Sequence, residues 1–411
     1  MSEKKGTILY IGNYIFPQDN AAGKRVYSNC CILRDLGYRV ISIGNNAGNT
    51  DKMSPEDIMK YDGIDSFSFC YSNGKKRLCY WVYFKRIMEL IHKLNIENDI
   101  YAVILYANLS ISLFNIRMRK WAQKKGIRCY ADCADWFEPP KENLMLRLWK
   151  KIDTDLQMNV FNRSVDGVIC ISSFLSNYYG SSHTVVIPPL TNISKKQSFV
   201  LTDCENDSVS FVYAGSKFRA GQPVHPQYWK DRLDLMIKGF YEAKLKDPSI
   251  KFEFRIIGIT KEEFIGHLPL ELKAEYQNIT DELASELIFF DYLPHDIVEN
   301  LISGSNFSVL IRDKKRMTMV GFPTKVSESI SCGTPVVYND TSDIHQYVGD
   351  GRFGFMVDGT TLADTIISIV HLDRSTLNSM KEDCYNNNPF DYRLFLNKMK
   401  EFLEVTKDAM E

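Results

Sequence analysis

Short apolar runs rich in β-branched residues alternate along the chain with longer segments whose apolar residues recur at helical spacing. This alternation is typical of parallel strands that helices cover on both faces. In the first half, the predicted strands are residues 7–15, 38–44, 65–71, 102–107, 127–134, 167–172 and 184–189. In the second half, they are residues 209–215, 251–258, 287–293, 307–312, 334–340 and 354–358.

The polar stretch 191–208 lacks apolar periodicity and separates the two series of strands, so we predict that it is a linker. The pattern therefore indicates an α/β fold with two doubly wound, Rossmann-like domains facing a central cleft, residues 1–195 and 209–385. Residues 386–411 are expected to form a C-terminal helix that packs back across the domains. The predicted apolar face of this helix consists of Phe390, Leu394, Met399 and Phe402. Ligands of such sheets bind outside the carboxyl ends of the strands.

Hydrophobic residues make up 45% of the 411 residues and charged residues 25%, which excludes a disordered chain, a collagen and a coiled-coil rod. An apolar run near the N-terminus follows lysines, but Gly12 and Asn13 interrupt it and no cleavage site for a signal peptide follows. The ten cysteines are scattered without a CxxC pair, as expected of reduced core thiols. We therefore expect a cytoplasmic protein. The cysteines and histidines also lack the spacing of a metal site.

The two halves of the chain differ in charge. Residues 1–200 contain 27 Lys and Arg and 18 Asp and Glu, whereas residues 201–411 contain 23 Lys and Arg and 33 Asp and Glu. The net charges of +9 and −10 indicate two domains with different partners, although chance is an alternative. Within the basic half, the aromatic and basic segment 75–94 could lie on an anionic membrane as a helix. The alternative is a helix that covers the sheet and directs its lysines to solvent. No nucleic-acid-binding motif accompanies this charge, so no nucleic-acid partner is expected.

The stretch 307–340 contains the most informative pattern of the chain. A strand ends at Arg312, a basic loop follows, and a helix is predicted between Pro323 and Gly333. Proline suits the first turn of a helix and glycine its C-terminal cap. The stretch is therefore predicted to be a strand, a loop, a helix and a second strand.

The start of this helix is a candidate anion site. The amides of Gly321, Phe322 and Thr324 would point into the cleft with the helix dipole behind them, which suits a diphosphate. Glu328 follows about a turn and a half further into the helix, where a carboxylate could accept hydrogen bonds from a ribose diol. The alternative is an ordinary turn before a helix, with a surface glutamate.

Several motifs occur in an order that resembles a known family. They are NAAGKRVYSNCCILRDLGYRVISIG, RSVDGVICISSFL, VVIPPL, VSFVYAGS, KDRLDLMIKGF, FRIIG, DYLPHDIVENLISGSNFSVLIR and GFPTKVSESISCGTPVV. Over about residues 7–400, the chain resembles the GT-B glycosyltransferases, and within them the retaining family 4, or group 1, enzymes.

This resemblance implies that residues 209–385 bind a nucleotide-sugar donor and that the first domain binds an acceptor. The ribose-binding glutamate of the family falls on Glu328 and its phosphate-binding lysine on Lys230. A lysine there would stabilise the departing diphosphate, although a solvated lysine before a helix is the alternative. Gly23 is either a donor contact or a helix-initiating glycine. The donor-binding residues that the resemblance implies are Gly23, Lys24, Gly215, Ser216, Lys230, Gly258, Pro294, Arg312, Gly321, Phe322, Pro323, Thr324, Lys325 and Glu328.

The chain departs from the family at two positions. The first glutamate of the family's E-x7-E pair falls on Val320, which cannot bond a sugar hydroxyl, so backbone amides and Lys325 are expected to replace it. The arginine that commonly follows the first glycine of the donor domain is Ser216, for which Lys217 or Arg219 could substitute.

The segment 131–140 resembles the acceptor side of the family and places Asp132, Asp135 and Glu138 near the end of a strand. Asp135 is the favoured residue to orient or deprotonate an acceptor hydroxyl, so Asp135 and Lys230 are the predicted catalytic residues. The segment Asp153–Asp155 matches a metal-binding DxD pattern. It lies in a helical stretch where its carboxylates would diverge, and we interpret it as solvated surface.

The combined expectation is a metal-independent glycosyltransferase without a cofactor. It would move a sugar, with retention, from a nucleoside-diphosphate sugar to a surface-glycan or lipid-linked glycan acceptor. The basic first domain would contact the inner face of an anionic membrane. Two alternatives stay open, a nucleotide-sugar 2-epimerase and a non-catalytic sugar-nucleotide-binding or scaffold protein. A nicotinamide dehydrogenase is disfavoured because GNYIFPQDNAAG is not the GxGxxG loop.

Overall fold

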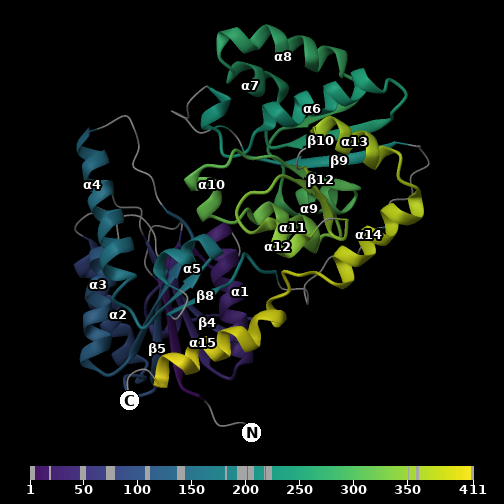
Figure 1. Ribbon diagram of the computed structural model, residues 1–411. Helices are drawn as coiled ribbons and strands as arrows, with labels where there is room; N and C mark the ends of the chain where they lie inside the picture. Colours follow the sequence, from purple (N-terminus) through teal and green to yellow (C-terminus); the bar gives the residue numbers. More distant parts are fainter. Residues whose placement is uncertain are drawn as a thin grey trace. The chain divides into compact units, whose positions relative to one another are not determined.

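The computed structural model describes residues 5–17, 20–46, 52–70, 79–106, 112–136, 144–180, 183–191, 201, 208–216, 218, 225–349, 351–357 and 361–408. Internal contacts group the chain into two units (Figure 1). The first unit comprises Met1–Asn192, Val320–Phe322 and Asp391–Glu411, and the second comprises Ile193–Met319 and Pro323–Phe390. The domain limits expected from the sequence stay a prediction, because most of the expected linker lies outside the described residues.

The first unit contains an eight-stranded sheet in the order β3-β4-β2-β1-β5-β6-β7-β8. β3 runs antiparallel to β4, and the other neighbouring strands are parallel. The strands are β1 Thr7–Ile15, β2 Arg39–Asn46, β3 Met59–Tyr61, β4 Ile64–Cys70, β5 Ile100–Tyr106, β6 Arg128–Cys133, β7 Gly167–Cys170 and β8 Thr184–Val186. The helices are α1 Ala21–Asp35, α2 Cys79–Lys93, α3 Ser112–Lys124, α4 Leu144–Asp155, a π-helical turn Leu156–Phe161, α5 Ser173–Tyr179 and α15 Leu396–Asp408, with 3-10 turns at Pro55–Asp57 and Tyr392–Phe395.

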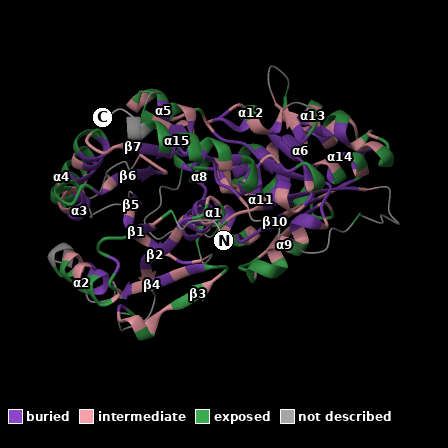
Figure 2. Cartoon of the chain, turned by 90° about the horizontal axis from the view of Figure 1, so that it is seen from below, coloured by how far each residue is buried: buried purple, intermediate pink, exposed green. Residues whose placement is uncertain are grey.

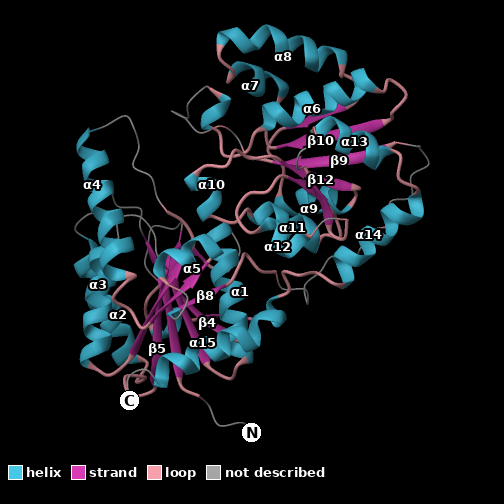
Figure 3. Ribbon diagram, in the orientation of Figure 1, coloured by secondary structure: helices cyan, strands magenta, loops and turns pink. Residues whose placement is uncertain are grey.

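The second unit contains a six-stranded parallel sheet in the order β11-β10-β9-β12-β13-β14. Figure 3 shows β9 between β10 and β12. Its strands are β9 Val209–Ala214, β10 Phe252–Ile257, β11 Leu287–Phe290, β12 Phe307–Leu310, β13 Val336–Tyr338 and β14 Gly354–Met356. Its helices are α6 Leu233–Lys246, α7 Lys261–Gly266, α8 Leu270–Glu282, α9 His295–Ser303, α10 Arg316–Val320, α11 Thr324–Ser331, α12 Ile344–Val348, α13 Leu362–Val370 and α14 Arg374–Asn386, with a 3-10 turn at Pro226–Tyr228.

The strands expected from apolar runs are present in both sheets, so the predicted doubly wound α/β fold is confirmed. In β1, four consecutive residues from Ile8 to Ile11 are at most 1% exposed, which explains a continuous rather than an alternating pattern (Figure 2). The short edge strand β3 was not predicted. Its residues Met59 and Lys60 are exposed, so it has no apolar run to reveal it.

The segment that was a candidate membrane helix covers the first sheet instead. Ile87, Leu90 and Ile91 on α2 are at most 2% exposed, so its apolar face is buried. The guanidinium of Arg117 on α3 lies 4.1 Å from the centre of the Phe84 ring. This arrangement matches the sheet-covering alternative.

The C-terminal segment belongs to the first unit, where α15 packs against α1 and β8. Phe402 is buried, and its ring centre lies 5.3 Å from that of Tyr130 in the sheet. The expected apolar face was wrong at Leu394, which is 65% exposed because it lies in the 3-10 turn before α15.

Core thiols are present as expected, since Cys30, Cys129, Cys133, Cys170 and Cys384 are buried and form no disulfide. Among the helices in the described ranges, none combines the length and the apolar composition needed to cross a membrane. Within these ranges, no cluster of three His, Cys, Asp or Glu side chains could hold a metal ion.

Candidate functional site at the carboxyl edge of the second sheet

The carboxyl ends of β9 and β12 lie beside each other in the second sheet, and polar side chains gather there. β9 ends at Ala214, β12 ends at Leu310, and Arg312 follows within two residues. Because ligands of parallel sheets bind beyond this edge, these side chains are the first candidates for a binding site.

The buried carboxylate of Asp231 organises this edge. Its Oδ1 accepts a hydrogen bond from Arg312 Nε at 2.7 Å, and its Oδ2 accepts one from Lys325 Nζ. The hydroxyl of Tyr213 also donates to Oδ2, at 3.1 Å. The side chains of Asp231 and Arg312 are 7% and 5% exposed, whereas that of Lys325 is 28% exposed. Lys325 is therefore the member of this Asp231 cluster with the most access to solvent.

The charges in the Asp231 cluster do not balance. Burial acts to raise the pKa of Asp231, but Lys325 and Arg312 outweigh burial and hold the pKa well below its usual range. One carboxylate therefore faces two cations, which leaves one positive charge in excess. In addition, Arg312 Nη1 is buried and has no hydrogen-bond partner within the described residues. Both features favour an anionic ligand.

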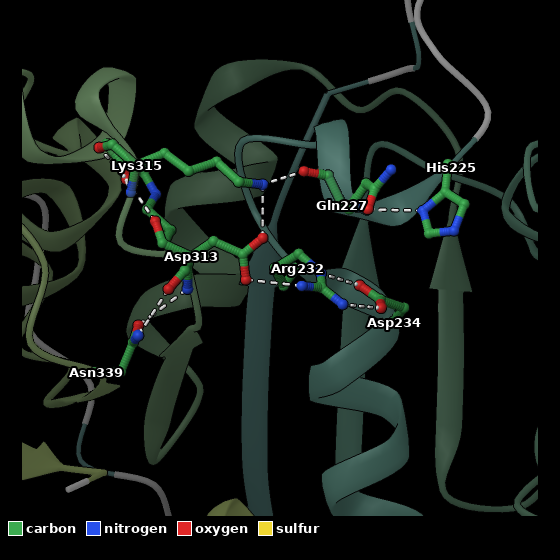
Figure 4. A network of polar contacts seen from close by, with 9 residues as sticks. His225, Gln227, Arg232, Asp234, Asp313, Lys315 and Asn339 are labelled. Atoms are coloured by element: carbon green, nitrogen blue, oxygen red, sulfur yellow. Dashed lines mark hydrogen bonds and ion pairs between the residues drawn. The ribbon is translucent and has the colours of Figure 1, made fainter.

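A second network holds the loop after β12 in place. Arg232 donates from Nε and Nη2 to the two carboxylate oxygens of Asp234, at 3.0 and 2.7 Å, and from Nη1 to Asp313 at 2.7 Å. Lys315 donates to the other oxygen of Asp313 at 2.7 Å and to the carbonyl oxygen of Gln227. Figure 4 shows Asp313 between Arg232 and Lys315. The β12 loop is thereby fixed to the segment that precedes α6.

Two further contacts near this network position the cluster and its neighbouring turn. The side chain of Asn339 accepts from Arg312 N at 2.9 Å and donates to Arg312 O at 2.7 Å, which fixes the backbone of Arg312. On the other side, His225 Nδ1 accepts from Gln227 N at 3.3 Å (Figure 4). The Arg312 guanidinium is therefore held before any ligand arrives, as electrostatic stabilisation requires.

The N-terminus of α11 adds backbone donors to this edge. Pro323 occupies the N-cap position and provides no side-chain cap, so the first amides of the helix lack the usual cap. Lys325 and Glu328, one turn apart on α11, both line a small cavity beside Ala214. The helix ends as expected, because Gly333 has a φ of +73° just after the C-cap.

Residues 221–372 match the family model described as glycosyl transferases group 1. This part of the chain is therefore similar to the group 1 glycosyl transferases. It contains the Asp231 cluster apart from Tyr213, and it contains the whole of α11.

The whole chain has the fold of solved glycosyltransferases. Sucrose-phosphate synthase from Thermosynechococcus elongatus is 13% identical, with a TM-score of 0.66 over 98% of this chain and 100% of that one. Trehalose 6-phosphate synthase from Burkholderia multivorans is 8% identical, with a TM-score of 0.62 over 98% and 99%. Anabaena HepE in complex with UDP is 14% identical, with a TM-score of 0.57 over 97% and 99%. No curated protein matches by sequence. The predicted GT-B fold is thus confirmed, and the match of residues 221–372 agrees with the predicted glycosyltransferase.

In the second unit, Arg312, Lys325 and Glu328 lie at the same edge of the sheet. The predicted lysine Lys230 is exposed, whereas its neighbour Asp231 enters the cluster. Ser216 is exposed just after β9. The proposed substitutes Lys217 and Arg219 lie outside the described residues.

The other predicted donor residues of the second unit lie at the ends of β9, β10 and β11. Gly258 has a φ of +89°, and a Cβ there would come within 2.7 Å of Gly215 O, so the backbones after β9 and β10 approach closely. Pro294 is exposed at the N-cap of α9. The structure thus gives the two glycines a packing role, and their donor contacts stay a prediction.

The remaining predicted residues belong to the first unit. A Cβ on Gly23 would lie 2.0 Å from Ile15 O, and Gly23 N donates to the Asn20 side chain at 2.7 Å. These contacts favour the helix-initiating alternative for Gly23. Its neighbour Lys24 is half-buried. Asp135 lies two residues after the end of β6, as expected. It is half-buried, and its side chain accepts a hydrogen bond from Trp136 N at 2.8 Å.

The residues just before α11 are grouped with the first unit as well. Val320 is fully buried, and its carbonyl oxygen accepts from Ser172 Oγ at 2.5 Å. Gly321 and Phe322 are also buried. The predicted contribution of their amides to diphosphate binding stays a prediction.

Two acidic residues that the sequence analysis considered, Asp132 and Asp153, are buried and bonded within the first unit. Asp132 is fully buried and paired with Arg25, so it belongs to the core of the first unit. The DxD carboxylates diverge as expected, but Asp153 is not solvated. It is 6% exposed and accepts from Ser112 Oγ at 2.5 Å, which makes it a link between α4 and α3. Glu138 lies outside the described residues.

Sequence reasoning missed Asp231 and Tyr213. Asp231 directly follows Lys230, the lysine on which the family resemblance placed the phosphate contact. The available signal was an acid between two basic residues, Lys230 and Arg232, just before a buried helix. When such an acidic side chain is buried at the start of a helix, its charge must be paired, and the cation can come from a distant part of the chain.

Proposed function

We propose that the enzyme binds a nucleoside-diphosphate sugar at the Asp231 cluster and transfers the sugar to a hydroxyl acceptor with retention and without a metal ion. The observation that carries the proposal is the excess positive charge of the cluster, two cations on one buried carboxylate. HepE, which has the same fold, has been solved with UDP and with UDP-glucose. That precedent supports a diphosphate as the anion.

Arg312, Lys325 and the first amides of α11 would hold the diphosphate, and Glu328 would accept hydrogen bonds from the ribose. As the bond to the sugar breaks, negative charge grows on the leaving diphosphate. Cations already held in place stabilise that charge without reorganisation, and such groups make large contributions to catalysis. Lys230, exposed beside Asp231, would contribute as a third cation.

The acceptor would be a surface-glycan or lipid-linked glycan intermediate, with Asp135 orienting its hydroxyl. A cytoplasmic enzyme with such an acceptor would contact the inner face of the membrane, and α4 offers a surface for this contact. Met145, Leu148 and Ile152 are 84%, 61% and 46% exposed, and Arg147 and Lys151 are exposed beside them. Exposed apolar and basic side chains on one helix suit an anionic bilayer surface.

The first test of donor binding is a thermal-shift screen against UDP, GDP, ADP, CMP, TDP and their common sugars, in EDTA. A ligand that binds only the folded state raises the melting temperature, so we expect one nucleotide to respond. The responding donor is then assayed with and without acceptor. A flat response would support a scaffold, and donor consumption without acceptor would support the 2-epimerase. Either result would overturn the proposal.

The membrane contact is tested by co-sedimentation with vesicles containing phosphatidylglycerol. Leu148→Glu on α4 is expected to reduce binding strongly, because it places a charge in the apolar face. Leu245→Glu on α6 is the matched control, since Leu245 is 60% exposed against 61% for Leu148. Equal binding by both variants would contradict a role for α4.

A further inference from the structure

A cavity of about 710 Å³ lies at the amino edge of the first sheet, where β6 and β7 begin. It is bordered by the last turns of α3, the turn after the π-helical segment, and Val405 of α15. Its basic lining residues are Arg119, Arg128, Arg163 and His183. The volume is in the range of small-molecule sites. Asp135 and Gly23 lie at the opposite, carboxyl edge of the same sheet.

The three arginines of this cavity bond neutral oxygens. Arg119 Nε donates to Ser164 O, and Arg163 Nη2 donates to Tyr178 O at 3.3 Å. Arg128 Nη1 donates to Leu403 O at 2.8 Å and to the Tyr101 hydroxyl at 2.6 Å. These contacts aim the guanidinium groups without neutralising them.

The single acidic side chain of the lining, Asp166, offsets only part of the charge of the three arginines. Asp166 accepts from Cys129 N at 2.6 Å, so one carboxylate oxygen serves the start of β6. No ion pair between these arginines and a carboxylate occurs among the described residues. Three arginines against one carboxylate leave positive charge in excess, and the arginines repel each other unless a further anion lies between them. The cavity is therefore built for a negative ligand.

We infer that this cavity binds a phosphorylated small molecule of the size of a sugar phosphate or a nucleotide. Guanidinium groups present paired donors that match phosphoryl oxygens. The ring of Tyr179 also lines the cavity, with the Arg163 guanidinium 5.8 Å from its centre. A single inorganic ion would leave most of the volume empty. The exposed apolar residues of α4 do not line the cavity, which separates this site from the proposed membrane contact.

The test is hydrogen-exchange mass spectrometry on the full-length enzyme with glucose 1-phosphate, UDP, inorganic phosphate or glucose at millimolar concentration. We expect glucose 1-phosphate or UDP to slow exchange in segments 126–129 and 162–168, and glucose to leave exchange unchanged. Arg163→Gln should weaken this protection about tenfold in affinity, the effect of one charge-assisted hydrogen bond. Arg163 is exposed, so the variant should fold, and circular dichroism checks that it does.

Two controls separate this site from the donor site. Arg147→Gln removes an exposed arginine of the same unit that does not line the cavity, and it should leave protection unchanged. Lys325→Ala, in the second unit, should weaken donor binding but preserve protection of segments 126–129 and 162–168. Loss of donor binding and loss of protection at the cavity can therefore be told apart, so the two proposals fail independently.

Three results would overturn the inference. The first is that no phosphorylated probe protects these segments, or that Arg163→Gln is protected as well as the parent enzyme. The second is that inorganic phosphate binds as tightly as the larger probes, which would reduce the site to a simple anion site. The third is that phosphatidylglycerol vesicles protect the segments and the soluble probes do not, which would assign the cavity to lipid headgroups.

Discussion

Each unit contains a buried carboxylate paired with an arginine, but the two clusters differ in charge balance. In the first unit, Arg25 Nε and Nη2 donate to Asp132 Oδ1 at 2.9 and 2.7 Å, and Arg25 Nη1 donates to Ile187 O at 2.7 Å. Tyr10 donates to Asp132 Oδ2 at 2.5 Å. Every nitrogen of this guanidinium has a partner, and the side chains of Arg25 and Asp132 are 3% and 0% exposed.

The Asp231 cluster of the second unit is unbalanced by comparison. Its carboxylate serves two cations, Arg312 has a buried nitrogen without a partner, and Lys325 is partly exposed. A neutral, fully bonded pair has no donor left for a ligand, although removing one partner would leave a buried charge unpaired. A cluster with one positive charge in excess can accept an anion. Burial of charge therefore marks a binding site only when the charges are unequal.

The largest expected effect is on stability in the first unit. Asp132→Asn leaves the buried Arg25 charge without a counter-charge, and breaking such a pair costs about 3–5 kcal/mol of unfolding free energy. Urea unfolding followed by circular dichroism measures this loss. The half-buried Asp135→Asn is the control and should change stability little. A loss for Asp132→Asn no greater than for Asp135→Asn would refute the structural assignment.

The second expected effect is on turnover in the second unit. Lys325→Ala removes a preorganised cation from the leaving diphosphate, and we expect kcat/KM to fall about 10²–10³-fold. The exposed Lys251→Ala is the control and should retain activity. Lys230→Ala should lose less than Lys325→Ala, since Lys230 lies outside the buried cluster. The reverse order would return the main phosphate contact to Lys230.

Much of the fold could be predicted because parallel strands are buried on both faces. The runs at β1, β5 and β9 are continuous and apolar, and they leave an unambiguous local signal. The edge strand β3 leaves none, because its exposed residues need no apolar pattern. Leu394 was misplaced because a helical period was extended through a 3-10 turn.

The site was predictable only in part, because it depends on contacts between distant residues. Arg312 and Lys325 were found through their place between a strand and a helix. Asp231 lies 81 residues from Arg312 and 94 from Lys325, and no local pattern joins them. The carboxylate that positions both cations becomes visible only when the sheet brings β9 and β12 together.

A smaller effect is expected from a change of shape at constant charge. Arg312→Lys keeps the positive charge but replaces the planar guanidinium by a compact ammonium. The guanidinium can donate to Asp231 from one nitrogen and to a diphosphate from another, and the ammonium cannot reproduce this arrangement. Donor kcat/KM should fall about tenfold, the loss of one charge-assisted hydrogen bond. Arg25→Lys in the first unit is the counterpart and should reduce stability instead. A fall in kcat/KM for Arg25→Lys with unchanged stability would contradict the division between the two clusters.

The smallest expected effect is the pH dependence of the Asp231 contribution. The pKa of Asp231 is lowered in the folded enzyme, because Lys325 and Arg312 outweigh burial, whereas an unfolded aspartate titrates near ~3.9. The ionised Asp231 therefore contributes fully to the free energy of unfolding when the pH is above the pKa of the unfolded state. This contribution is lost as the pH falls toward the lower pKa of the folded state. The stability difference between the parent enzyme and Asp231→Asn should stay constant from about pH 8 to 5 and shrink by about 1 kcal/mol near pH 3. Urea unfolding at each pH measures this difference. A difference that shrank already between pH 8 and 5 would show that Asp231 is not held ionised by two cations, and the contrast with the balanced Asp132 pair would lose its basis.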